Sequence, residues 1–116
     1  MNIYNSNGRL PYNGTYYQYV ITQDYECVIV NQTWRRGGQN GSSGTIQLVR
    51  DGIASNAQGI YNWAVNEGDT YYGFISYCIV DVKAGDIIRQ LDAYKGQGNN
   101  YVVGGQMMAL VGIINN

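Results

Sequence analysis

The sequence predicts an all-β fold, a single antiparallel β-sandwich in one domain over residues 1–116, on three observations. Branched and aromatic residues (Val, Ile, Thr, Tyr, Phe and Trp) number 42, whereas Ala, Leu, Glu and Lys together number 14. Branched and aromatic side chains suit a pleated sheet and lose rotamer freedom in a helix. Sixteen Gly and thirteen Asn supply turns, and an apolar content of 45% is enough for one core.

Turn signals divide the chain into segments of strand length, spaced as in a sandwich. The predicted strands are Thr15–Thr22, Tyr25–Trp34, Gly44–Arg50, Ile60–Val65, Tyr71–Val82, Ile87–Tyr94 and Gly105–Ile114, with shorter ones at Ile3–Tyr4 and Tyr101–Val103. The predicted turns are Arg50-Asp51-Gly52, Asn66–Asp69, Lys83–Asp86 and Lys95–Asn100.

Two of these strands are apolar at consecutive positions. The run Cys27–Val30 is apolar throughout, as is the run from Met107 to Val111, which continues to Ile113 and Ile114. A sheet with one face in water alternates apolar and polar residues, so both faces of these strands must be covered. We expect the cover to be another copy of the chain, and the alternative is a strand or loop of the same chain. The candidate interface residues on the closing strand are Met107, Met108, Leu110, Val111 and Ile113.

Several classes of function are excluded or disfavoured by composition. The chain has no histidine, so a Ser–His or Cys–His nucleophile and an imidazole metal site are impossible. An enzyme without histidine would have to work through carboxylates, Lys or Tyr, and we expect no catalytic residues, no metal, no cofactor and no enzyme activity. A net charge of −1 argues against nucleic acid binding, and no apolar run approaches the ~20 residues of a membrane-spanning helix. The polar N-terminus does not have the pattern of a secretory signal.

The carboxylates and cysteines allow two interpretations each. Asp81, Asp86 and Asp92 are close in sequence and could form a calcium cluster, but Asp86 lies in a Gly-Asp turn where it would cap backbone N–H groups. Cys27 and Cys78 lie in apolar strands and are predicted to be buried free thiols, with a bridge between them as the alternative.

Three segments in the second half of the chain resemble, in order, parts of a known family. Thr45–Gly52 resembles a strand and turn, Cys78–Leu91 a hairpin around Lys-Ala-Gly-Asp, and Gly104–Gly112 a closing strand near the C-terminus. The chain is similar in these features to the tumour-necrosis-factor and complement-head jelly-roll superfamily. The resemblance implies a jelly roll of two antiparallel sheets, and a compact homotrimer whose closing strand lies near the three-fold axis.

Within that superfamily the chain resembles the small jelly rolls of bacteriophage virions. The expected function is a non-enzymatic capsid decoration, head-fibre or fibre-tip protein, made in the host cytoplasm, located on the virion surface and bound to capsid or fibre proteins. The alternative is a soluble trimeric lectin of the same fold. Twelve tyrosines suit either a sugar-binding surface or half-buried sheet positions. The residues we expect to contact a glycan are Trp34, Arg35, Tyr61 and Trp63.

Overall fold

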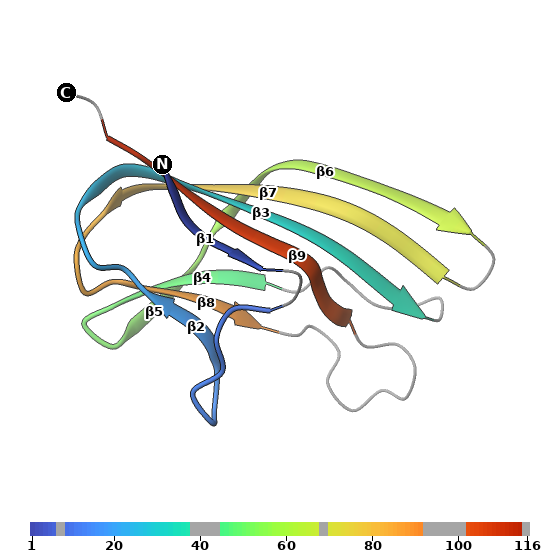
Figure 1. Cartoon of the computed structure of the whole chain (residues 1–116), viewed down its shortest axis with the longest axis horizontal. Helices are drawn as coiled ribbons and strands as arrows, with labels where there is room; N and C mark the ends of the chain where they lie inside the picture. Colours follow the sequence, from blue (N-terminus) through green and yellow to red (C-terminus); the bar gives the residue numbers. More distant parts are fainter. Residues whose placement is uncertain (7–8, 38–44, 68–69, 92–101, 115–116) are drawn as a thin grey trace.

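A computed structural model describes residues 1–6, 9–37, 45–67, 70–91 and 102–114. The strands in this part of the chain form two antiparallel sheets, which confirms the predicted β-sandwich (Figure 1). They are β1 (Asn2–Ser6), β2 (Tyr17–Val20), β3 (Tyr25–Gly37), β4 (Thr45–Arg50), β5 (Ile53–Asn56), β6 (Gln58–Glu67), β7 (Thr70–Val82), β8 (Ile87–Leu91) and β9 (Val102–Ile113). The described ranges include no helix long and apolar enough to cross a membrane.

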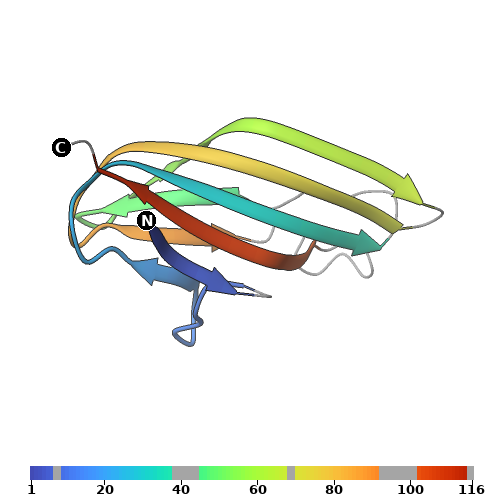
Figure 2. The ribbon, with the colours of Figure 1, turned by 45° about the horizontal axis from the view of Figure 1, so that its top comes forward.

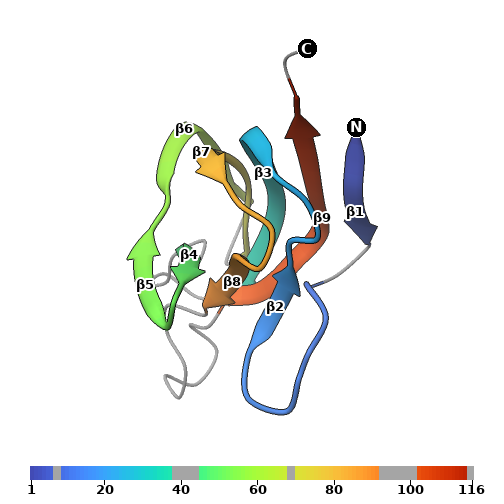
Figure 3. The ribbon, with the colours of Figure 1, turned by 90° about the vertical axis from the view of Figure 1, so that its left-hand side faces the viewer.

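Each sheet combines strands from distant parts of the chain. The five-stranded sheet has the order β1-β9-β3-β7-β6, and the four-stranded sheet has the order β2-β8-β4-β5. Figure 3 shows the two sheets end-on, with β1 and β6 at the edges of the larger one. The longest strands, β3, β7 and β9, are neighbours in the middle of the larger sheet, whose broad face is turned toward the viewer in Figure 2.

The core lies between the sheets and is filled by alternate side chains of the paired strands. From the five-stranded sheet, Val28, Val30, Met108 and Leu110 are completely buried. From the four-stranded sheet, Ile46 and Ile88 are completely buried and face the same cluster. Burying a large aliphatic side chain is worth ~1.5–3 kcal/mol, so these positions account for much of the driving force for folding.

The strand β5 was not predicted. After Ile53 the segment Ile53–Asn56 consists of small and polar residues, and all four positions are exposed, so it has no apolar pattern to detect. It is held by its hairpin with β4, in which Arg50 pairs with Ile53 across the predicted turn. Asp51 and Gly52 have φ values of 52° and 78°, the left-handed geometry of a two-residue hairpin turn.

After β5 the chain passes from one sheet to the other with only Ala57 between the strands. The amide of Ala57 donates to the carbonyl of Ile46 at 2.7 Å, and β6 then pairs with β7 in the larger sheet. In Figure 3 this crossing closes the side of the sandwich.

Other predicted bounds differ in detail. The segment predicted as Thr15–Thr22 is a strand only over Tyr17–Val20, and the two segments predicted around Gly104 belong to the continuous β9. The register between β9 and β3 shifts between Thr33 and Arg35, at the part of β9 where the two predicted segments meet. Some parts of the predicted elements lie outside the described residues. These are Gly44, residues 92–94, Tyr101, residues 68–69 of one turn and the whole Lys95–Asn100 turn.

Candidate functional site

The surface of the five-stranded sheet that faces away from the core is the candidate functional site, and we call it the outer face. Because successive strand residues point to opposite sides, the outer face takes the residues that alternate with the core positions. Its members are Cys27, Ile29, Asn31 and Thr33 of β3, Phe74, Ser76, Cys78 and Val80 of β7, Met107, Ala109, Val111 and Ile113 of β9, and Tyr61 and Trp63 of β6. None of these residues carries a charge.

Large apolar side chains on the outer face are open to solvent in the single chain. Val80 is 64% exposed, Ile113 41% and Met107 39%. Val80 lies on β7 and the other two lie on β9, with Val80 and Ile113 at one end of the face and Met107 toward the other. No described part of the chain covers them, so the alternative that a strand or loop of the same chain fulfils this role has no support within the described residues.

The middle of the outer face holds one polar pair. The hydroxyl of Ser76 donates to Oδ1 of Asn31 at 2.6 Å, between neighbouring strands. This bond pairs the Ser76 hydroxyl with the Asn31 carbonyl oxygen inside the face.

The opposite surface of the sandwich is different. On the four-stranded sheet, a row of polar side chains runs across all four strands, from Gln18 through Arg89 and Gln47 to Asn56. Gln47 Nε2 donates to Asn56 Oδ1 at 2.9 Å, and the Arg89 guanidinium lies 3.8 Å from the centre of the Tyr16 ring. A polar and charged row of this kind is typical of a surface in water.

The closing strand β9 contributes to both the core and the outer face. Of the five candidate interface residues, Met108 and Leu110 have no exposed surface and belong to the core. Met107, Val111 and Ile113 lie on the outer face. The sequence predicted that one alternate set would fill the core and the other would need a second cover, and the structure assigns the residues to each.

The four candidate glycan-contact residues are only partly located. Tyr61 and Trp63 lie on the edge strand β6, 55% and 51% exposed, and the Tyr61 ring is 6.0 Å from that of Phe74. Trp34 and Arg35 lie on β3, where they pair with Gly73 and Tyr72. The side chains of Trp34 and Arg35 are outside the described part of the structure, so a grouping of the four remains a prediction.

Cys27 and Cys78 lie together on the outer face, which corrects the expectation that both are buried. Both are free thiols and half-buried, and their sulfur atoms are 2.9 Å apart. Desolvation, assisted by the hydrogen bond with Cys78, raises the pKa of the Cys27 thiol to about 11. The sequence placed each cysteine in an apolar strand, but gave no signal that the two strands are neighbours.

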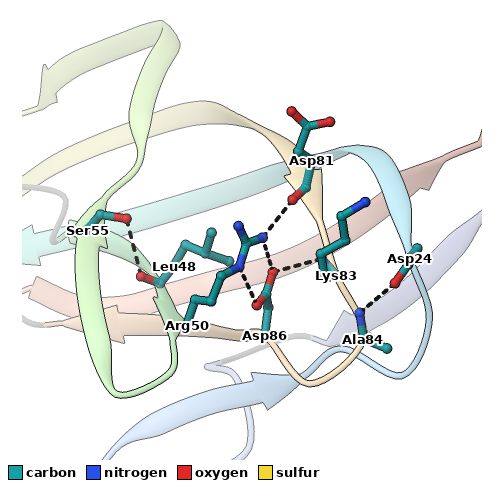
Figure 4. A network of polar contacts seen from close by, with 8 residues as sticks. All are labelled: Asp24, Leu48, Arg50, Ser55, Asp81, Lys83, Ala84 and Asp86. Carbon is teal, nitrogen blue, oxygen red and sulfur yellow. Dashed lines mark hydrogen bonds and ion pairs between the residues drawn. The ribbon is translucent and has the colours of Figure 1, made fainter.

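At one end of the sandwich, a polar network joins the turns (Figure 4). Asp86 is 3% exposed, and its carboxylate accepts hydrogen bonds from the Arg50 guanidinium and the Lys83 amide. The predicted capping role of Asp86 is therefore correct. Across the turn, the Ala84 amide donates to Oδ1 of Asp24 at 2.9 Å.

The calcium alternative has no support in the described residues. With Asp86 engaged by Arg50, its oxygens are already paired, and Asp92 lies outside the described part of the chain. Among the described residues, no group of three or more Cys, Asp or Glu side chains could hold a metal ion.

A scan against protein-family models, a search of curated proteins and a search of solved structures all find no match to the chain.

Proposed function

We propose that the protein is a non-enzymatic structural protein that assembles as a homotrimer through the outer face and is displayed on a virus particle. The observation that carries the proposal is the contrast between the two outer surfaces of the sandwich. The described side chains on the three central strands of one surface carry no charge and are mostly apolar. The other surface has a polar row with Arg89 at its centre, beside a shorter row formed by Val20, Ile87, Val49 and Ala54.

The energetics favour covering the outer face. Each large apolar side chain left in water forgoes ~1.5–3 kcal/mol relative to burial. Val80, Met107 and Ile113 are all substantially exposed in the single chain. The described side chains of the face carry no charge to be desolvated, so an uncharged surface of another copy of the chain suits it, and in a three-fold ring that surface is a different patch of the neighbouring copy.

The strand order supports the jelly-roll part of the proposal. The first, last, third and seventh strands are neighbours in one sheet, and the second, eighth, fourth and fifth in the other. This interleaving of strands from both halves of the chain is the arrangement of two interlocked Greek keys. In the superfamily that the sequence resembles, the closing strand lies near the three-fold axis, and here β9 carries Met107, Val111 and Ile113 on the outer face.

The virion part of the proposal depends on the resemblance to phage jelly rolls and on composition. The partners would be capsid or fibre proteins, and the trimer would reinforce the shell or present an adhesive surface. A protein with this role needs no catalytic group, metal or cofactor.

Light scattering on the purified protein tests the assembly. We expect three times the chain mass of 12.9 kDa at micromolar concentration. Val111→Asp should reduce the mass to that of one chain, whereas Ala54→Asp, on the four-stranded sheet, should leave it unchanged. A wild-type mass of one chain would refute the trimer. Co-purification with intact virus particles tests the location, and its absence from purified particles would refute the virion role.

A lectin is the second candidate, and the exposed aromatic side chains of β6 favour it. Tyr61 and Trp63 lie at the rim of the outer face, where a subunit junction would leave their rings open to stack on a sugar. A glycan array decides between the two classes. Saturable binding to one sugar type, abolished by Trp63→Ala, would support the lectin, and binding to no glycan would eliminate it.

A further inference from the structure

The two cysteines of the chain converge on the outer face from neighbouring strands. Cys27 of β3 pairs with Val80, and Cys78 of β7 pairs with Ile29, so the two cysteines are diagonal neighbours across the ladder. Both side chains turn away from the core and are half-buried. Their sulfur atoms are 2.9 Å apart, and a disulfide bond is about 2.05 Å long, so bond formation needs an approach of less than ~1 Å.

We infer that Cys27 and Cys78 form a dithiol site that a small-molecule disulfide such as glutathione disulfide oxidises to an intrachain bridge. Sulfur atoms this close give a mixed disulfide on one cysteine an immediate resolving thiol on the other. The bridge would tie β3 to β7 in the middle of the five-stranded sheet.

The exchange proceeds in two balanced steps. In the first step the thiolate of one cysteine attacks glutathione disulfide, forms a mixed disulfide and releases one glutathione thiolate. The other cysteine, whose sulfur lies 2.9 Å away, then loses its proton to solvent, attacks the protein sulfur of the mixed disulfide and releases the second glutathione. Burial raises the pKa of the Cys27 thiol to about 11, which slows the step in which Cys27 acts as the thiolate. The protein loses two electrons and two protons, and glutathione disulfide becomes two glutathione molecules.

The position of the pair links its chemistry to assembly. Cys27 lies beside Ile113 and Val80 on the outer face. If the proposed function holds, and this step depends on it, a neighbouring chain covers the pair in the trimer. Oxidation should then be faster in dissociated chains than in the assembled protein.

The experiment uses the reduced full-length chain, incubated with excess glutathione disulfide at about pH 8. Thiol counting after unfolding should fall from two per chain to none, with a mass loss of about 2 Da for the bridge. Cys27→Ser and Cys78→Ser, each with one thiol, should instead gain a glutathione adduct of about 305 Da.

Val111→Asp and Met107→Lys, both on the outer face, provide the dissociated chain. Faster oxidation of these variants than of wild type would support both the dithiol site and its coverage by a neighbouring chain. Equal rates would support the dithiol site but overturn its coverage by a neighbouring chain. Retention of both thiols in wild type and in both variants would overturn the site, as would a stable glutathione adduct on wild type or a disulfide-linked dimer. Light scattering on the same samples reports the trimer separately.

Discussion

The carboxylate of Asp86 accepts two hydrogen bonds from the guanidinium of Arg50, at 2.9 Å from Nε and 2.6 Å from Nη2. Arg50 ends β4 and Asp86 directly precedes β8, so this ion pair connects the β4–β5 turn to the β7–β8 turn. Nη2 of Arg50 also donates to the carbonyl of Asp81 at 2.7 Å. One arginine thus fixes both ends of a turn whose Gly85 has a φ of 93°.

The first prediction concerns acid stability. The hydrogen bond from Arg50, and after it that from the Lys83 amide, lowers the pKa of Asp86 below its ordinary value of 3.8. The unfolded chain therefore binds this proton first as the pH falls. The stabilisation is complete above pH 3.8 and is lost as the pH falls through the folded-state pKa.

Thermal melts from about pH 7 to about pH 2.5 measure this effect. Asp86→Asn should lower the Tm at neutral pH, and its Tm should fall less steeply below pH 3.8 than that of wild type. Asp24→Asn, which retains the Arg50 pair, is the matched control. Parallel curves of Tm against pH for wild type and Asp86→Asn would show that the Arg50–Asp86 ion pair does not stabilise the fold as described.

The second prediction concerns a close approach inside the sandwich. A Cβ atom added at Gly112 would lie 2.4 Å from Cε1 of Tyr25 and 2.9 Å from Cδ1 of Ile3. Tyr25 is 5% exposed, so its ring has little room to move. Gly112→Ala should therefore lower the free energy of unfolding by about 1–3 kcal/mol in urea titrations.

Gly59→Ala is the control for this change. The nearest atom to its added Cβ is Cδ1 of Ile75 at 3.5 Å, an ordinary contact. Its stability should stay close to that of wild type. Equal stability of Gly112→Ala and wild type would mean that the Tyr25 ring yields without cost.

The third prediction concerns metal ions. Because the Asp86 carboxylate is occupied by Arg50 and by the Lys83 amide, we expect no calcium to bind there. A chelator should leave the Tm unchanged, and millimolar calcium should not raise it. A decrease in Tm on adding a chelator would instead support a calcium site formed by carboxylates that include Asp92.

Sequence patterns predicted those parts of the fold in which the residue types alone indicate a buried strand or a turn. The runs Cys27–Val30 and Met107–Val111 are apolar at every position, and both proved to be central strands with two apolar faces. The Lys83–Asp86 turn was found because Gly85 and Asp86 are residues that such turns require.

Features set by distant contacts were not predictable in this way. Gln32 and Gln90 are 1% and 2% exposed, although glutamine usually marks a wet face. Gln90 Oε1 accepts a hydrogen bond from the Leu10 amide, a partner 80 positions away. The meeting of Cys27 with Cys78 likewise depends on the β3–β7 register, and no local pattern specifies which strands pair.

The last prediction uses two adjacent residues of β9 that point to opposite sides of the sheet. Leu110 has no exposed surface and packs in the core, whereas Val111 is half-buried on the outer face. Leu110→Asp places an unpaired carboxylate in the core and should cost more than about 4 kcal/mol, enough to leave the chain unfolded by circular dichroism. Val111→Asp keeps its charge at the surface of a single chain, so the variant should retain the β-sheet spectrum. It should fail to assemble, because three like charges would meet near the proposed axis. A folded Leu110→Asp variant would contradict the assignment of the core, and a Val111→Asp variant that is still trimeric by light scattering would place the interface elsewhere.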